Sequence, residues 1–573
     1  MMRKRIKDIP RRQVRPLSKI YQSSLFLLTD LYQLKIAYVL FKLGLLDLEV
    51  VASLHTRKNP FGGPLAKDTV ESGDGGYTVH VGLSAMIDYI EHYLPDESDL
   101  RFIAGMSENG KRLFDREFIN FLRELRYRFK MWALRDGEIF FPNEEVVRLI
   151  CPLWLFVLLE TPSLFLTGYP SVVATRAARM VQAANGRPVA EYGLRRSPEA
   201  VMASIAARIG GCSSTSNMLA AKHHGIPWSG SGTSHAAMTA LTAEFGSETG
   251  AMEEMGAVFG QGMYPVADTT STLLGAKHAA QANIKLKAEL RGELAGVRLD
   301  SGDLAILSRE VRIILNHFDQ MTMHIQATND LDELIIESLL LMQGAQIDGV
   351  AAGTKAVNVP SLGCIFKVTM VRKGQRGWKH VAKNSDTMAK AGYAGYFNWR
   401  RYLDQAGNFD FDLRYDETLM RGSVVAAEEI CPEEPCYRYV YPHDLQDRSM
   451  FVPNREDGWL SASDPRENGW RTDISPQRKF EDPLIQIFAD DKLLFDECPS
   501  IDDSMKYCRK QLARLHESVR RLHNPNVYHV GLENRSYLLR RAMQDENRRR
   551  VEEEVRQLRE EVGLIPVSGV MSK

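Results

Sequence analysis

The sequence predicts an α/β protein: an irregular α/β barrel of parallel strands, with a flanking α/β (α+β) domain built from the N-terminal and C-terminal parts. Two observations predict this class. Between residues 170 and 355, short apolar segments alternate with helical segments, with roughly 25–30 residues between strands, as expected for βαβ units. Polar and small residues follow the end of one apolar segment after another. The second pattern suggests a ligand-lined mouth, because reacting groups of parallel barrels lie at the carboxyl ends of strands.

Length and composition narrow the class further. The chain has 573 residues, 44% hydrophobic and 25% charged, which is ordinary for a globular protein of two or three packed units. Its net charge of -1 offers no electrostatic argument for nucleic acid or a membrane as partner. The 7 cysteines are scattered with no Cys-x-x-Cys pair, which argues against disulfide frameworks and zinc ribbons and favours a reducing cytoplasm.

The sequence divides into four parts. Residues 1–19 form a basic arm, expected to be disordered, although its arginine-rich character leaves a targeting signal open. Residues 20–150 form an N-terminal α/β domain, and 151–375 form the barrel with the active site. Residues 376–573 form a C-terminal region of strands, an irregular segment (428–480) and helices that pack on the other two parts. The apolar run 151–168 is interpreted as buried core, because it is short for a membrane span and contains Glu160.

Periodicity predicts the individual elements. Helices are expected at 25–48, 82–95, 171–185, 198–210, after 300 to about 318, and at 330–342, 504–521 and 534–560. Strands are expected at 296–300, 323–328 and 347–353, with shorter ones before 192, 213 and 229. Segments 364–372 and 379–384 are predicted to be antiparallel strands, and 59–76 is a loop rich in Gly, Pro, Asp and Ser.

Six strand ends carry polar residues, and each has a plain structural interpretation beside the functional one. The ends are 192–196, 213–217, 232–235, 300–303, 328–330 and 353–354. Asp300 and Asp303 are either active-site carboxylates or a helix cap and a solvated acid. His235, in "SGSGTSH", is either incidental or a nucleophile for a phosphoryl group. Gly353 and Thr354 bind a phosphate through free backbone N–H groups or form an ordinary turn.

Several of these segments resemble the nicotinate phosphoribosyltransferase family, in the family's order, over about residues 25 to 545. The matching segments are "LLTDLYQL" (27–34), "RKNPFGG" (57–63), "LLET" (158–161), "ATRAAR" (174–179), "EYGLRRSP" (191–198), "STSNMLA" (214–220), "VRLDSGDL" (297–304), "ATNDLDE" (327–333), "AAGTKAV" (351–357) and "PSLGCIFKV" (360–368). Each segment is short, but together they are highly specific.

The resemblance implies an enzyme, a nicotinate phosphoribosyltransferase, that works as a homodimer with active sites shared across the interface. It joins nicotinate to 5-phosphoribosyl 1-diphosphate and releases nicotinate mononucleotide and diphosphate, a step of NAD salvage. It implies Mg²⁺ as cofactor and ATP as co-substrate, with ATP hydrolysis coupled through a phosphohistidine. The resemblance assigns that histidine to His235.

Under this resemblance, the acids have a physical role. Breaking the ribose C1–O bond develops positive charge on the sugar, which a preorganised carboxylate stabilises more in the transition state than in the ground state. Asp300 is expected to face the ring or the ribose, and Asp303 to bind ribose hydroxyls or magnesium, which prefers a few carboxylates plus substrate phosphates. Arg298 is expected to reach the pyridine carboxylate or a phosphate.

The resemblance also implies which residues contact each part of the substrates. A flat aromatic substrate favours aromatic faces on both sides, which implies Tyr192 from one subunit and Tyr32 from the other. The remaining implied contacts are Arg195 for the substrate carboxylate or a phosphate, Arg57 (across the interface) and Lys367 for phosphates, and Asn329, Gly353 and Thr354 for the 5'-phosphate. Ser216 stands where the nicotinamide enzyme has an acid, and a hydroxyl that donates to a carboxylate favours nicotinate.

Two departures from the family pattern keep alternatives open. The turn before His235 is one residue tighter than usual, which puts ATP coupling in question, and residues 64–72 are an insertion near Arg57. The alternatives are a nicotinamide or quinolinate phosphoribosyltransferase, and a non-catalytic homologue that acts as a binding protein.

Overall fold

The computed structural model describes residues 24–564 except for short internal stretches. The residues outside the description are 1–23, 64–74, 126–127, 231, 260–261, 383–392, 421–450, 454–459, 463–478, 491, 495–498, 533 and 565–573. The predicted basic arm, the insertion at 64–72 and most of the segment 428–480 therefore lie outside the described residues.

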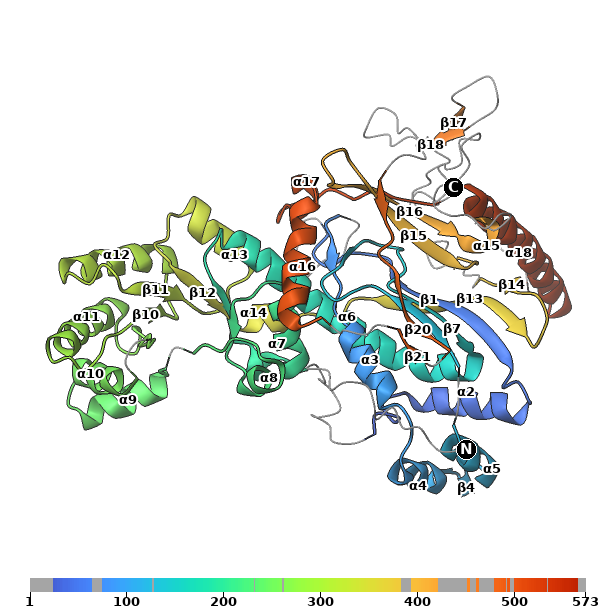
Figure 1. Ribbon diagram of the computed structural model, residues 1–573, viewed down its shortest axis with the longest axis horizontal. Helices are drawn as coiled ribbons and strands as arrows, with labels where there is room; N and C mark the ends of the chain where they lie inside the picture. Colours follow the sequence, from blue (N-terminus) through green and yellow to red (C-terminus); the bar gives the residue numbers. More distant parts are fainter. Residues whose placement is uncertain are drawn as a thin grey trace.

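The protein is mixed α/β, with a five-stranded parallel sheet in one part and, in another, an antiparallel seven-stranded sheet and a mixed four-stranded sheet (Figure 1). Helix α6 (Leu153–Ala183) lies in the centre of the view, between the two parts. The parallel strands and helices α9 (His235–Glu244) to α12 (Leu304–His317) lie to its left, and the seven-stranded and four-stranded sheets to its right. The expected parallel sheet is thus confirmed.

The parallel sheet has five strands in the order β10-β11-β12-β8-β9. They are β8 (Val189–Glu191), β9 (Ser214–Thr215), β10 (Gly296–Leu299), β11 (His324–Ala327) and β12 (Gly349–Ala352). A parallel bridge adds Val266 beside Arg298 of β10, and another adds Trp228 beside Thr215 of β9, so two short segments extend the sheet at its ends. The alternate residues of β10 and β11, Val297, Leu299, Ile325 and Ala327, are fully buried under the helices, which explains why these strands form.

Helices connect these strands: those expected at 198–210, after 300 and at 330–342 are confirmed, whereas the helices between residues 218 and 288 and the short one at 354–357 are not among the expected ones. The connecting helices are α7 (Ala200–Ile209), α8 (Met218–His224), α10 (Glu248–Phe259), α11 (Thr272–Ala288), α13 (Glu333–Glu337, continued by a π-helical turn at Ser338–Met342) and α14 (Thr354–Val357), with α9 and α12. Side-chain caps define several starts: Asn217 accepts from the backbone N–H groups of Leu219 and Ala220, and Asp332 from those of Leu334 and Ile335.

A seven-stranded sheet combines strands from distant parts of the sequence, in the order β14-β13-β1-β7-β5-β20-β21. They are β1 (Leu48–Thr56), β5 (Lys130–Ala133), β7 (Val147–Pro152), β13 (Cys364–Lys373), β14 (Lys379–His380), β20 (Ile485–Ala489) and β21 (Lys492–Leu493). Strands β13 and β14 pair antiparallel, as predicted. A four-stranded sheet adds β19 (Phe480–Glu481), β15 (Phe397–Leu403), β16 (Phe409–Asp416) and β22 (Val530–Leu532).

The remaining elements cover these sheets or join them. The helices are α2 (Leu31–Lys42), α3 (Leu83–Glu91), α4 (Glu97–Gly105), α5 (Arg116–Arg123), α15 (Glu417–Met420), α16 (Ile501–Arg514), α17 (Glu517–Arg520) and α18 (Asn534–Glu561). The short strand pairs are β2 (Thr78–Val79) with β6 (Ile139–Phe140), β3 (Ser107–Glu108) with β4 (Lys111–Arg112), and β17 (Phe451–Pro453) with β18 (Leu460–Ala462).

The sequence predicts the apolar run 151–168 and the helix 171–185 as separate segments, but in the structure both belong to the single helix α6. It passes through Pro162 and Pro170. A proline removes the hydrogen bond to the carbonyl four residues earlier, so the carbonyl needs another donor. Thr29 Oγ1 donates to the Leu158 carbonyl that Pro162 leaves open, at 3.3 Å. The helix therefore continues because a neighbouring segment replaces the lost bond.

By length and composition alone α6 resembles a membrane span. In the protein, however, 78% of its most apolar stretch is buried inside the fold. The burial agrees with the prediction that this run is core, since helix α2, helix α7 and the seven-stranded sheet all pack on it.

Candidate active site

The strand ends expected to carry chemistry meet at one edge of the parallel sheet. Because all the strands run the same way, their carboxyl ends share this edge, which holds Asp268, Asp300, Thr328, Gly353, Tyr192, Ser216 and Ser229 in order across the sheet. The backbone N–H of Tyr192 donates to the carbonyl of Ala352 at 2.8 Å, so the ends of β8 and β12 lie side by side. We call this the carboxyl edge.

His235 lies against two carboxylates at this edge. Its Nε2 atom is 3.6 Å from Asp300 Oδ2 and 3.8 Å from Asp268 Oδ1, and its Nδ1 is 3.4 Å from Thr269 Oγ1. The imidazole is 46% exposed, so a ligand can reach it. A nitrogen nucleophile beside two acids thus faces solvent.

Local contacts fix the tightened turn before His235. Gly232 takes a left-handed φ of 78°, which glycine adopts without strain. The Val266 backbone N–H donates to Thr233 Oγ1 at 2.9 Å, which ties the turn to the end segment of the sheet. Ser234 caps α9 by accepting from the Ala237 backbone N–H, and His235 is the first residue of that helix.

The two acids of the "LDSGD" segment differ in their surroundings. Asp300 accepts a short hydrogen bond from Thr328 Oγ1 at the end of β11, and its other oxygen faces His235. Asp303 is the N-cap of α12, since its Oδ1 accepts from the backbone N–H groups of Ala305 and Ile306 at 3.0 Å. Asp303 therefore acts as a helix cap, the structural role considered in the sequence analysis. Its second oxygen accepts no hydrogen bond from any described residue.

On the other side of the edge, three hydroxyl groups form a chain. Tyr192 Oη lies 3.4 Å from Ser229 Oγ, which lies 2.6 Å from Ser214 Oγ. Ser216 follows β9 directly, and its backbone N–H donates to the Glu191 carbonyl at 2.9 Å. An aromatic face and several hydroxyl groups thus line one region.

Glu191, which the sequence interpretation did not select, organises this region. It is 1% exposed, and its carboxylate accepts from Ser204 Oγ of α7 at 2.9 Å, from Thr215 Oγ1 of β9 at 2.6 Å, and from the Gly193 backbone N–H. One buried carboxylate therefore holds Tyr192, Ser216 and helix α7 in fixed relation.

The face of the sheet away from its helices carries unpartnered polar atoms. Arg298 and Gln326 are register partners on β10 and β11, so their side chains share a face. The Arg298 Nε and Gln326 Oε1 atoms are buried and have no hydrogen-bond partner among the residues that the structure describes. Arg195, on the short helix Leu194–Arg196, is exposed.

The predicted 5'-phosphate residues follow β11 and β12. Asn329 is exposed and has a φ of 102°, an uncommon value that asparagine tolerates better than most residues. Gly353 and Thr354 form the start of the short helix α14. All three lie at the carboxyl edge.

Tyr32, Arg57 and Lys367 lie apart from this edge. Tyr32 is on α2 and 51% exposed, Arg57 follows β1, and Lys367 is on β13, which pairs with β1. Figure 1 shows α2, β1 and β13 to the right of α6, and β10 and α9 to its left. Within one chain, the structure therefore separates the predicted residues into two groups.

Asp268 and Thr269 were also not identified as site residues from the sequence. They follow the short segment "YPVA", which repeats the pattern of an apolar segment ended by polar residues. This segment joins the sheet through a single bridge, so it lacks the length that marks a strand. The polar residues "DTT" (268–270) after this apolar segment are the sequence feature that could have indicated a strand end here.

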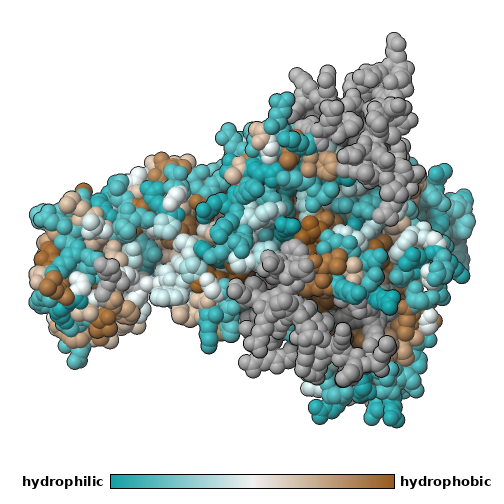
Figure 2. Space-filling model, viewed as in Figure 1, coloured by the Kyte–Doolittle hydropathy of each residue, from teal (hydrophilic) through white to brown (hydrophobic). Residues whose placement is uncertain are grey.

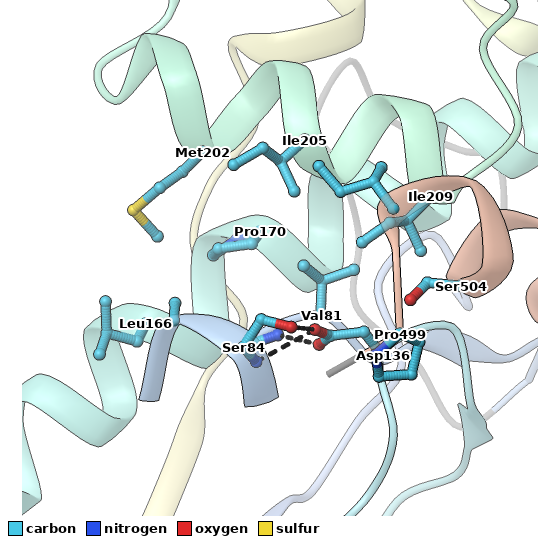
Figure 3. A pocket seen from close by; sticks show the side chains of 13 residues that line it. Val81, Ser84, Asp136, Leu166, Pro170, Met202, Ile205, Ile209, Pro499 and Ser504 are labelled. Carbon is cyan, nitrogen blue, oxygen red and sulfur yellow. Dashed lines mark hydrogen bonds between the residues drawn. The ribbon is translucent and has the colours of Figure 1, made fainter. Parts of the chain in front are cut away.

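An open pocket of about 450 Å³ lies elsewhere, between α6, α7 and α16 (Figure 3). Its lining is mostly apolar and includes Leu166, Met202, Ile205 and Ile209. Its acid, Asp136, already accepts hydrogen bonds from the backbone N–H groups of Gly82, Leu83 and Ser84 and from Ser84 Oγ. None of the predicted site residues lines this pocket, so the carboxyl edge is the better candidate.

In the described part of the chain, no group of three or more His, Cys, Asp or Glu side chains is placed to hold a metal ion by itself. Asp300 has one oxygen near His235, and Asp303 lies three residues later at the start of α12. Such a pair suits magnesium that takes its other ligands from a phosphate-bearing substrate and water.

Comparison with known proteins gives a consistent result. Residues 27–167 match the nicotinate phosphoribosyltransferase (NAPRTase) N-terminal domain, and residues 454–540 match the nicotinate phosphoribosyltransferase C-terminal domain. The chain is 28% identical to the nicotinate phosphoribosyltransferase of Bacillus subtilis over 543 residues, 93% of this chain and 98% of that one. It is also 28% identical to the enzyme of that name from Dictyostelium discoideum, over 88% of this chain and 86% of that one.

Solved structures support the fold. The human nicotinic acid phosphoribosyltransferase superposes with a TM-score of 0.66 at 23% identity, covering 90% of this chain and 99% of the human one. The nicotinate-nucleotide pyrophosphorylase of Pyrococcus furiosus superposes with a TM-score of 0.55 at 19% identity, covering 85% of this chain and 94% of the other.

The central position of Glu191 leads to a prediction. Glu191→Gln places an amide NH₂ where a carboxylate oxygen accepts hydrogen bonds, so a buried donor is left unpaired. We expect the free energy of unfolding to fall by about 1–3 kcal/mol, measured by urea titration. Glu244→Gln, at the exposed end of α9, is the matched control and should change it by less than about 0.5 kcal/mol. Equal stability of the two variants would contradict the role of Glu191.

Proposed function

The chain belongs to the nicotinate phosphoribosyltransferase family, and we propose that its carboxyl edge joins nicotinate to 5-phosphoribosyl 1-diphosphate, releasing nicotinate mononucleotide and diphosphate. The observation that carries the proposal is the convergence of His235 with Asp268 and Asp300 on the edge that also holds Tyr192 and Ser216. The curated relatives that match nearly the whole chain bear the name of this activity.

We infer that the parallel sheet curls toward the irregular barrel expected from the sequence. Ser229 hydrogen-bonds to Thr215 at one end of the strand row, and Thr233 to Val266 at the other. The chain from Ser229 to Thr233 advances by only four residues, which span at most about 14 Å. Seven strands in a flat sheet extend over about 29 Å, so a flat arrangement does not fit the contacts. Curling brings Tyr192 and Asp300 to face a common centre.

The transfer chemistry follows from the acids. As the ribose C1–O bond to diphosphate breaks, positive charge develops on the sugar, and the pyridine nitrogen of nicotinate forms the new bond to C1. The Asp300 carboxylate, oriented by Thr328, is placed to stabilise that charge. Because Thr328 fixes the carboxylate before the reaction, little reorganisation is needed in the transition state.

The acceptor is proposed to bind beside Tyr192. Its ring offers a face for the pyridine, and Arg195 and the Ser216 hydroxyl can donate to the nicotinate carboxylate. Ser216 rather than an acid at this position favours nicotinate over nicotinamide, whose NH₂ groups need an acceptor. Arg298, with its unpartnered Nε, is a second donor available to the carboxylate or to a phosphate.

ATP coupling is proposed to run through His235. The carboxylates of Asp268 and Asp300 beside Nε2 favour the proton on that nitrogen, and Nδ1, which has Thr269 Oγ1 at 3.4 Å, is the proposed nucleophile. The γ-phosphoryl group of ATP would transfer to Nδ1 with release of ADP, and water would later hydrolyse the phosphohistidine to phosphate. The turn at Gly232 supports this assignment despite its shortened spacing.

Magnesium is the proposed cofactor. Asp300 and Asp303 are the residues proposed to hold it, together with substrate diphosphate and water. When bound, it would neutralise charge on the departing diphosphate. Asn329, Gly353 and Thr354 are proposed to bind the 5'-phosphate at the ends of β11 and β12. The reaction is proposed to take place in the cytoplasm.

A homodimer would unite the two groups of residues. Helix α2 presents an exposed apolar surface beside Tyr32, made of Leu31, Ile36, Val39 and Leu43 at 42%, 39%, 52% and 65% exposure. Figure 2 shows further hydrophobic atoms on the lobe of α9 and α10, where Phe245, Val258 and Phe259 are exposed. Surfaces of this kind mark protein interfaces. A second copy could bring Tyr32, Arg57 and Lys367 to the carboxyl edge.

The direct test is an assay of the purified chain with 5-phosphoribosyl 1-diphosphate and Mg²⁺, with and without ATP. Nicotinate, nicotinamide and quinolinate are compared at equal concentration, and mononucleotide and diphosphate are measured. We expect product from nicotinate and stimulation by ATP. Preference for another acceptor would reassign the substrate, and no diphosphate release with any acceptor would favour a non-catalytic binding protein.

The role of His235 is tested by His235→Ala. The variant should retain slow transfer but lose stimulation by ATP, because the phosphoryl acceptor is gone while Asp300 and Tyr192 remain. His317→Ala, on the exposed C-terminal end of α12, is the control and should behave as the wild type. Full stimulation of His235→Ala by ATP would remove the histidine from the coupling step.

Shared sites predict complementation. Tyr32→Ala and Asp300→Asn should each be nearly inactive alone, because each removes a different group from every site. Mixing the two under conditions that exchange subunits should restore activity, since some sites then combine an intact Tyr32 with an intact Asp300. Activity that stays at the level of the separate variants, together with a monomeric mass in solution, would exclude the shared-site dimer.

A further inference from the structure

A buried ion-pair cluster lies between α6 and α13. Glu333 is 2% exposed, and its carboxylate accepts from Arg179 Nε at 2.8 Å and from Arg176 through a short bond. Arg176 and Arg179 are themselves 8% and 4% exposed. Burial acts to raise the pKa of Glu333, but the two guanidinium groups outweigh it and hold the pKa below its usual value. The carboxylate is thus kept charged inside the protein.

The cluster also supports the loop that carries Arg57. The Phe61 ring lies 4.1 Å from the Arg176 guanidinium carbon and 5.5 Å from that of Arg179. Phe61 has a left-handed φ of 59°, which a bulky residue adopts only when its surroundings require it. The stacking on Arg176 accounts for that conformation, because it holds the ring against the ion pair.

The same cluster fixes the end of β11. Glu333 is the first residue of α13, whose cap is Asp332, and it follows Asn329 by four positions. Thr328, one residue earlier, holds Asp300. The chain from 328 to 333 therefore runs directly from the carboxyl edge into the ion pair.

A third segment joins at the same place. Arg179 Nη2 donates to the Leu522 carbonyl at 2.8 Å, and His523 pairs with Glu337 on α13. Gly76 and Asn526 are joined by a backbone hydrogen bond of 3.0 Å, so this C-terminal loop also borders the Arg57 loop. The ion pair is where three segments that are distant in sequence meet.

We infer that Glu333, held by Arg176 and Arg179, is a positioning residue that fixes the Arg57 loop and the Asn329 strand end in one rigid unit and so sets the affinity for the phosphoribosyl donor. The inference rests on the proposed function, in which both segments bind donor phosphates. Because Glu333 is buried, its proposed role is indirect. It acts through Phe61 on one side and through the 328–332 turn on the other.

This role differs from general stabilisation in a measurable way. A residue that merely holds the fold together affects both substrates and the turnover rate alike. A residue that positions phosphate-binding segments affects the donor, whereas the acceptor region is organised separately by Glu191. The expected signature is therefore a rise in the KM for the donor with the KM for nicotinate unchanged.

The test uses the full chain with four variants. Glu333→Gln removes the charge, and Glu333→Asp keeps it on a shorter side chain. Phe61→Leu leaves the ion pair intact and removes only the stacking, which keeps the test usable if Glu333→Gln fails to fold. Glu337→Gln, on the same helix and paired with the same C-terminal loop through His523, is the matched control. Steady-state kinetics for both substrates and calorimetric binding of 5-phosphoribosyl 1-diphosphate are measured.

We expect Glu333→Gln to raise the donor KM by about ten- to one-hundred-fold, since small misplacements of binding groups carry effects of this size. Phe61→Leu should shift it in the same direction by less, Glu333→Asp should recover part of the affinity, and Glu337→Gln should match the wild type. Equal changes in both KM values, or no change in either, would overturn the inference. Failure of the wild type to form product while it still binds the donor would contradict the proposed function alone, and failure to bind the donor would contradict both.

Discussion

The burial of helix α6 is the constraint on which the rest of the structure depends. This 31-residue helix packs against α2, α7, α13 and the strands β1 and β13, so it is shared by the parallel and the antiparallel parts. Its apolar side chains drive that packing, since burial of apolar surface is the dominant favourable contribution to folding. Its polar residues join the helix to neighbouring segments. Thr175 and Ser171 accept from the backbone N–H groups of Val79 and Val81. Arg176 and Arg179 bind Glu333 of α13.

Much of the parallel part could be predicted from the sequence. The strands at 296–299, 324–327 and 349–352 and the helix 304–317 follow from strict local patterns, because alternating burial and capping residues are local properties. The single helix α6 could not be predicted in this way, because Pro162 and Pro170 signal a break that only tertiary contacts overcome. The carbonyl that Pro162 frees is satisfied by Thr29, more than a hundred positions away.

The same distinction applies to the candidate site. Residues that directly follow an apolar strand segment, such as Asp300 and Tyr192, can be found in the sequence because the change from apolar to polar residues marks the end of the strand. Asp268 belongs to a segment held by one bridge, and Glu191 becomes central only through partners on α7 and β9. The residues next to Asp268 and Glu191 in the sequence therefore do not predict either role. The separation of Tyr32 from the carboxyl edge is likewise a property of the whole chain, since it depends on the positions of two sheets on either side of α6.

The loop that follows Arg57 shows how such a protein can tolerate a change in length. Asn59 is fully buried, and its side-chain amide donates to the carbonyls of Gly75 and Gly76 at 3.2 and 3.1 Å, while Thr78 donates to its oxygen at 2.8 Å. These bonds clasp the two ends of the 64–74 stretch together. The cost of closing a longer loop between fixed ends grows only with the logarithm of its length. A change in the length of that stretch is therefore expected to leave the position of Arg57, which precedes Asn59, unchanged.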